Sequence, residues 1–195
     1  MNMKKVPNAL CIIRIVLIPF ILIFLLENPL SVWIPQTARI LISGILYGIA
    51  MLTDLFDGKI ARKYDAITDF GKFIDPIADK MLVLSILLAF VDMNLISSVP
   101  VILILAREFL VTGLRLGAMN HGKVVAANIW GKAKTMTQGI LIGISFALLL
   151  AASLISDPEI QGTLLFLPEI FAWIAACITA VSGLTYYNEC KDYIK

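Results

Sequence analysis

The stretch DLFDGKIARKYDAITDFGKFIDPIADK, residues 54–80, contains six aspartates in a chain that is otherwise strongly apolar. Four of them form two closely spaced pairs, Asp54 with Asp57 and Asp75 with Asp79. Residues three or four positions apart lie on the same face of an α-helix. The spacing therefore predicts two helices that each present a pair of carboxylates to one side.

Small residues accompany both pairs of aspartates. Gly58 and Ala61 share the helical face of the first pair, and Gly71 shares the face of the second pair if that helix begins early enough. Pro76 does not settle where the second helix begins, because proline suits a first helical turn but removes a hydrogen bond inside a helix. The small side chains leave room for a bulky group against the first helix.

The composition favours an integral membrane protein. The chain has 195 residues, 59% of them hydrophobic, and a mean hydropathy of +0.91, whereas soluble domains are about 45–50% apolar. This length fits a single domain, residues 1–195. The three cysteines lie far apart and there is one histidine, which argues against a thiolate or histidine metal site and against a disulfide framework. We expect a lipid bilayer as partner and no nucleic acid.

Apolar runs predict an all-α integral membrane fold. A short interfacial segment at the N-terminus precedes the first run, and although its two lysines imitate a signal peptide, no A-x-A cleavage site follows. Each run is long enough for a membrane-spanning helix of ~20 residues. The six predicted spans are residues 9–26, 37–56, 73–91, 97–118, 134–155 and 164–186.

Loop charges orient the chain, because cytoplasmic loops are enriched in lysine and arginine. Basic residues gather at the N-terminus, between spans two and three, around the connection of spans four and five, and in the C-terminal tail. Of the 16 basic residues, only Arg39 clearly belongs to the opposite face. We therefore expect both termini and the aspartates on the cytoplasmic side.

The four paired aspartates predict a divalent metal site. An aspartate at the bilayer centre costs roughly 2.5–3.5 kcal/mol, and carboxylates that share a site resist joint ionisation. Neighbouring cations offset part of this cost, but salt bridges alone do not explain the spacing. Oxygen ligands without cysteine or histidine suit Mg²⁺ or Mn²⁺, and four carboxylates suffice for two ions. Asp65 and Asp69 are expected to be solvated charges in the connection 63–70.

The pattern D-x2-D-G-x2-A-R-x8-G-x3-D-x3-D, starting at Asp54, resembles the signature of the CDP-alcohol phosphotransferase family at every fixed position. Members of that family are six-span proteins of similar length with both ends in the cytoplasm. The resemblance implies transfer of a phosphatidyl or similar group from a CDP-linked donor to an alcohol, with release of CMP. It also favours a homodimer, which Gly44-x-x-x-Gly48 and Gly139-x-x-x-Gly143 permit, although these small residues equally suit helix packing within one chain.

The same resemblance assigns roles to the motif residues. It implies that four aspartates hold two divalent ions against the donor pyrophosphate, and that Asp79 also acts as the base toward the acceptor hydroxyl. A carboxylate near that hydroxyl is chemically suited to this task. The residues implied for the cytidine-diphosphate pocket are Gly58, Ala61, Arg62 and Gly71.

The first span opens with PNALCIIRIVLIPF, residues 7–20, which is similar to bacterial phosphatidylglycerophosphate synthases. In those enzymes an asparagine and an arginine six residues apart contact the nucleotide, and Asn8 and Arg14 occupy these positions. Arg14 lies inside an apolar run, so we expect an anionic partner for it. Cys11 stands where those enzymes usually have threonine.

Two further segments, AREFLVTGLRLG (106–117) and GKAKT (131–135), place a surplus of cations near the cytoplasmic side. Such a surplus suits an acceptor that carries phosphate, and both segments resemble the part of phosphatidylglycerophosphate synthases that binds sn-glycerol 3-phosphate. Glu108 is expected to fix Arg107 or Arg115, which share a helical stripe with Val111. The predicted acceptor residues are Arg107, Arg115, Lys132, Lys134 and Thr135.

These observations predict an enzyme of the bacterial cytoplasmic membrane, with its active site facing the cytoplasm, that uses CDP-diacylglycerol and sn-glycerol 3-phosphate. A transferase of the same family with inositol phosphate, serine or phosphatidylglycerol as acceptor is the nearest alternative. A divalent-cation transporter is a different class of hypothesis. It requires carboxylates further across the bilayer, and the outer halves of the six predicted spans contain a single one, Glu169.

Overall fold

The structure is a computed structural model that describes residues 6–63, 69–120 and 129–191, with side chains 55–63 outside the described part. Over these ranges the chain is helical and has no strand, which confirms the all-α prediction. The helices are α1 (Val6–Leu25), α2 (Gln36–Lys63), α3 (Asp69–Asp92), α4 (Ser98–Asn120), α5 (Ile129–Leu154) and α6 (Pro158–Cys190), with a 3-10 turn, η2 (Pro29–Val32), between α1 and α2.

Each predicted span coincides with one of these helices. Four of them, α1, α2, α5 and α6, are long and apolar enough to cross a membrane. The remaining two, α3 and α4, are interrupted by charged residues that belong to the site described below. The structure therefore agrees with an integral membrane protein.

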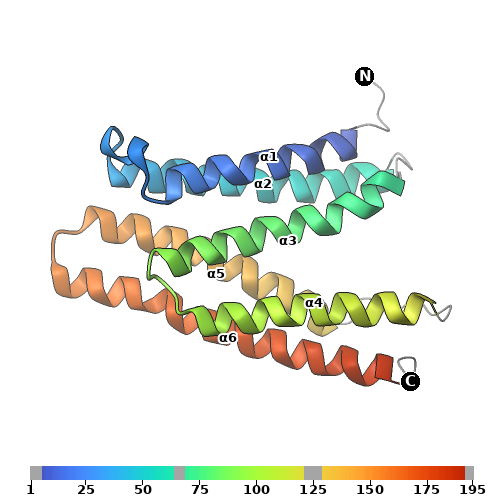
Figure 1. The fold of residues 1–195 in the computed structure, drawn as a ribbon. Helices are drawn as coiled ribbons and strands as arrows, with labels where there is room; N and C mark the ends of the chain where they lie inside the picture. The colour runs from blue at the N-terminus through green and yellow to red at the C-terminus, as the bar shows by residue number, and fades with distance from the viewer. Residues whose placement is uncertain (1–5, 64–68, 121–128, 192–195) are drawn as a thin grey trace.

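The helices form one bundle (Figure 1). On one side α1 packs against α2 and α3, and on the other α6 packs against α4 and α5, while α2 contacts α5 between them. The Phe146 ring of α5 joins these layers, because it stacks on Tyr47 of α2 at 5.6 Å and meets Phe90 of α3 edge-on at 5.5 Å. The beginning of α1 and the end of α6 lie at the same end of the bundle.

The connection between the third and fourth predicted spans begins with a Schellman motif at the end of α3. Asn94 has a φ of 55°, a left-handed conformation that asparagine tolerates better than most residues. Its N–H donates to the carbonyl of Val91 at 2.9 Å, and the N–H of Leu95 donates to that of Phe90 at 2.9 Å. These bonds satisfy helix-end carbonyls, so α4 can begin only a few residues later.

The aspartate-rich stretch is more helical than expected. The second helix continues to Lys63, and α3 begins at Asp69, which is therefore the first residue of a helix rather than part of a loop. Gly71 consequently lies within α3, and Pro76 lies inside this helix rather than in its first turn. The proline removes one backbone hydrogen bond next to Asp75.

The two G-x-x-x-G pairs serve helix packing with only one glycine each. A Cβ on Gly44 would meet Phe146 at 3.6 Å, and one on Gly139 would meet Met51 at 3.8 Å. Both glycines therefore lie where α2 and α5 meet, and a methyl group at either position would make an ordinary van der Waals contact. A Cβ on Gly48 or Gly143 would meet nothing within 4 Å.

Candidate active site

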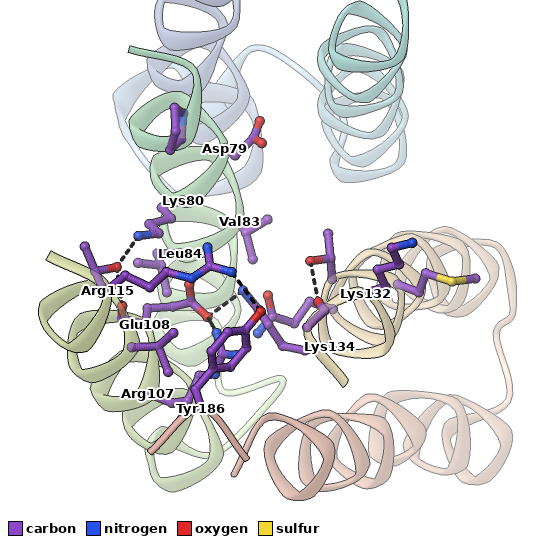
Figure 2. A pocket seen from close by; sticks show the side chains of 17 residues that line it. Asp79, Lys80, Val83, Leu84, Arg107, Glu108, Arg115, Lys132, Lys134 and Tyr186 are labelled. Carbon is purple, nitrogen blue, oxygen red and sulfur yellow. Dashed lines mark hydrogen bonds and ion pairs between the residues drawn. The ribbon is translucent and has the colours of Figure 1, made fainter. Parts of the chain in front are cut away.

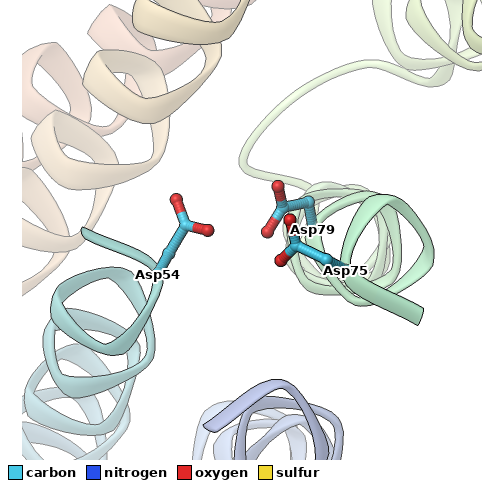
Figure 3. Close-up of side chains that lie close together, drawn as sticks. All are labelled: Asp54, Asp75 and Asp79. Carbon is cyan, nitrogen blue, oxygen red and sulfur yellow. The ribbon is translucent and has the colours of Figure 1, made fainter. Parts of the chain in front are cut away.

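Three of the predicted metal ligands come together at the end of the bundle where α1 begins and α6 ends. Asp54 of α2 faces Asp75 and Asp79 of α3 (Figure 3), and one carboxylate oxygen from each lies within 4.8 Å of the others. Two oxygens on opposite sides of a Mg²⁺ ion are about 4.2 Å apart, since each lies ~2.1 Å from it. Small side-chain adjustments therefore allow all three to bind one ion.

Arg14 of α1 lies among these carboxylates and is fully buried. Its Nη2 lies 3.0 Å from Asp54 Oδ1 and its Nη1 lies 3.3 Å from Asp75 Oδ1, and Nη1 also contacts Asp79. The anionic partner expected for Arg14 is thus found. With all three carboxylates ionised, the cluster would carry two negative charges beyond the charge of Arg14, and one divalent cation would balance them.

The thiol of Cys11, one turn before Arg14, extends the same polar cluster. Its Sγ donates a hydrogen bond to Asp75 Oδ1 at 3.6 Å. Asn8 lies half-buried in the first turns of α1, and Gly71 is half-buried in α3. Their contacts with a nucleotide remain predictions.

Four other motif residues belong to the helical part of α2 by their backbone. Their side-chain surroundings, however, lie outside the described residues, so their predicted roles rest on the sequence alone. These residues are Asp57, Gly58, Ala61 and Arg62.

A cavity of about 650 Å³ adjoins the carboxylate cluster, and Asp79 belongs to its wall. Figure 2 shows that its lining comes from α3, α4, α5 and α6. The structure thus gathers around one space the residues that the sequence predicts for the acceptor, although their role in binding remains a prediction. They are Arg107, Arg115, Lys132, Lys134 and Thr135.

Glu108 lies at the centre of this basic set and is buried. Its Oε1 lies 3.4 Å from Arg107 Nη1, in agreement with the expectation that Glu108 fixes one of the arginines. It also lies 2.5 Å from Lys134 Nζ, a contact that the sequence did not predict. One carboxylate therefore holds cations from both α4 and α5.

The last helix contributes positioning residues that the sequence analysis missed. Arg115 donates from Nη2 to the Tyr186 hydroxyl at 2.8 Å, and its Cζ lies 4.8 Å from the centre of the Tyr186 ring. The Cζ of Arg107 lies 5.4 Å from the same ring centre. Tyr186 is only 1% exposed, so one buried ring orients both arginines through cation–π contacts and a hydrogen bond.

Two neighbours of Tyr186 on α6 support Arg107 as well. The Ser182 hydroxyl accepts a hydrogen bond from Arg107 Nη2 at 2.6 Å. A Cβ at Gly183 would lie 3.0 Å from Arg107 Cγ, so the absence of a side chain lets Arg107 lie against α6. The signal in the sequence is the i, i+4 spacing of Ser182 and Tyr186, but it is weak because neither residue is charged.

Comparison with known proteins identifies the family. The family model described as CDP-alcohol phosphatidyltransferase matches residues 4–183. The chain belongs to this family. The resemblance that the aspartate motif carries is therefore confirmed, and the protein is a member of a transferase family.

Several relatives match this family member over most of their length. The CDP-diacylglycerol--glycerol-3-phosphate 3-phosphatidyltransferase of Rickettsia typhi is 41% identical over 194 residues, which cover 98% of the chain and 99% of the relative. The protein of the same name from Bacillus subtilis is 39% identical over 200 residues, or 99% and 98% of the two chains. A probable phosphatidylglycerophosphate synthase of Mycobacterium tuberculosis is 37% identical over 188 residues, or 95% and 81%.

Proposed function

We propose that this protein transfers a phosphatidyl group from CDP-diacylglycerol to sn-glycerol 3-phosphate and forms phosphatidylglycerophosphate and CMP. The observation that carries this proposal is the cavity that joins Asp79 of the carboxylate cluster to a set of buried and half-buried cations. The names of relatives that match nearly the full chain support the same acceptor.

On the donor side, we propose that Asp54, Asp57, Asp75 and Asp79 hold two divalent cations. Mg²⁺ or Mn²⁺ held by these carboxylates would supply the positive charge that polarises the donor pyrophosphate and stabilises the departing CMP. The geometry of the three described carboxylates suits hard cations. We propose that Arg14, which lies within this cluster, also contacts a phosphate of the donor. The other proposed donor contacts are Asn8, Gly58, Ala61, Arg62 and Gly71.

On the acceptor side, we propose that cations at the cavity bind the phosphate of glycerol 3-phosphate. The acceptor hydroxyl oxygen then attacks the phosphorus attached to the diacylglycerol, and its proton passes to the Asp79 carboxylate. The bond from this phosphorus to the bridging pyrophosphate oxygen breaks, and CMP leaves with that oxygen. The proposed phosphate contacts are Arg107, Arg115 and Lys134, which line the cavity together with Lys132 and Thr135.

We further propose that all six helices cross the membrane as one domain of a bacterial cytoplasmic membrane protein. The even number of long helices and the common end of α1 and α6 support termini on one side. The lysines and arginines of the connections at this end support a cytoplasmic location. A homodimer is proposed from the family resemblance and from the open faces of Gly48 and Gly143.

The decisive experiment offers purified protein CDP-diacylglycerol together with one acceptor at a time. We expect metal-dependent CMP release with sn-glycerol 3-phosphate and none with serine, inositol phosphate or phosphatidylglycerol. Turnover with inositol phosphate but not with glycerol phosphate would overturn the proposed acceptor. Divalent-cation flux into liposomes that contain no CDP-lipid would instead favour a transporter.

A further inference from the structure

Lys80 immediately follows Asp79 and lines the same cavity. Its ammonium donates a hydrogen bond to the hydroxyl of Thr112 on α4 at 2.6 Å (Figure 2). That hydroxyl donates its own proton to the carbonyl oxygen of Glu108 at 2.7 Å. Because a hydroxyl has one proton and two lone pairs, Thr112 acts as a fixed acceptor and aims the Lys80 ammonium toward α4.

Among the described side chains, no carboxylate offsets the charge of Lys80, in contrast to Arg107 and Lys134 at the same cavity. Lys134 and Arg107 both contact the Glu108 carboxylate, and Arg115 lies against Tyr186. Within the described ranges no carboxylate contacts the Lys80 ammonium, whose partner Thr112 is neutral. An ammonium has three donors, so two remain for an anion that enters the cavity.

We propose that Lys80 is a further phosphate-binding residue and contacts the phosphate of the acceptor. This inference rests on the proposed function. The position of Thr112 indicates that Lys80 contacts the phosphate of the acceptor substrate rather than the pyrophosphate of the donor substrate. It lies four residues after Glu108 and three before Arg115, on the helical face that carries the acceptor set. A Lys80 side chain held by Thr112 therefore adds its charge to the phosphate-binding end of the cavity, although its backbone lies beside Asp79.

The alternative is a lysine retained only for its charge at the cytoplasmic side of the membrane. Substitution distinguishes the two readings. In Lys80→Gln we expect the KM for sn-glycerol 3-phosphate to rise by about tenfold or more, equivalent to about 1.4 kcal/mol, and the KM for CDP-diacylglycerol to change by less than about twofold. Competitive inhibition by inorganic phosphate should weaken in parallel. Lys80→Arg keeps the charge and should restore most of the affinity.

Two further variants complete the experiment. Thr112→Val keeps the shape and the Lys80 charge but removes the aiming hydroxyl, so a smaller rise in the same KM is expected. Lys191→Gln is the matched control, because it removes one positive charge at an exposed site outside the cavity. An unchanged KM for glycerol phosphate in Lys80→Gln overturns the proposal, as does an equal loss toward both substrates.

Failure of the proposed function looks different from failure of this inference. If the acceptor is wrong, the unmodified enzyme itself shows no turnover with sn-glycerol 3-phosphate. If only Lys80 is wrong, the unmodified enzyme turns over and Lys80→Gln behaves like Lys191→Gln. If Lys80→Gln fails to fold, Lys80→Arg and Thr112→Val still test the proposal. A normal KM for glycerol phosphate together with normal phosphate inhibition in Thr112→Val would contradict the orientation of the Lys80 ammonium by Thr112.

Discussion

Replacing Tyr186 by phenylalanine tests whether α6 aligns the arginines of the cavity. The change removes the hydroxyl that accepts from Arg115 at 2.8 Å but keeps the ring against which both arginines lie. A hydrogen bond to a charged group is worth about 1.5–3 kcal/mol, and each 1.4 kcal/mol corresponds to about tenfold. The ring contacts still orient Arg115 in this variant, so we expect a loss at the lower end of this energy range. This loss corresponds to a rise of about tenfold in the KM for sn-glycerol 3-phosphate.

The assay follows CMP release by purified enzyme in detergent, with one substrate varied at saturation of the other. The KM for CDP-diacylglycerol should stay unchanged, because Tyr186 belongs to the wall of the cavity around the basic set. Tyr186→Leu also removes the two cation–π contacts, each worth about 0.5–2 kcal/mol. This second variant should therefore bind glycerol phosphate more weakly than Tyr186→Phe.

Tyr47→Phe is the matched control, since it makes the same chemical change in another buried tyrosine. The Tyr47 hydroxyl has no hydrogen-bond partner within the described residues, and its ring packs on Phe146 away from the cavity. Removing an unsatisfied hydroxyl relieves a desolvation cost of about 1–3 kcal/mol, so the melting temperature should stay equal or rise and both KM values should not change. An unchanged acceptor KM in Tyr186→Phe would refute the alignment of Arg115 by α6.

Three more predictions concern the metal cluster and the acceptor set. Asp79→Asn should abolish CMP release while the melting temperature and part of the CDP-lipid binding persist, and near-normal turnover would refute its role as base. A chelator such as EDTA should stop turnover and added Mg²⁺ or Mn²⁺ should restore it, whereas activity that survives chelation contradicts the metal site. Lys134→Ala should raise the KM for sn-glycerol 3-phosphate by about tenfold, and an unchanged value would remove Lys134 from the acceptor site.

Local chemistry made much of this protein predictable. Apolar runs of about 20 residues indicated all six helices, because a helix of that length matches the thickness of the hydrocarbon core of a bilayer. The three- and four-residue spacings of the aspartates indicated helical faces and a site for hard cations. The position of Pro76 was ambiguous, since the sequence signals for a helix start at this point are weak, and the structure resolves it with a helix that begins at Asp69.

Contacts between distant segments required the tertiary structure. Residue patterns alone predicted that Arg14 needs an anionic partner and that Arg107 and Arg115 share a helical face. Only the fold showed that Asp54, Asp75 and Asp79 surround Arg14, and that Tyr186 lies against both other arginines. The physical reason is that periodicity specifies which side of a helix a residue occupies, whereas the neighbouring helix it meets depends on how the whole bundle packs.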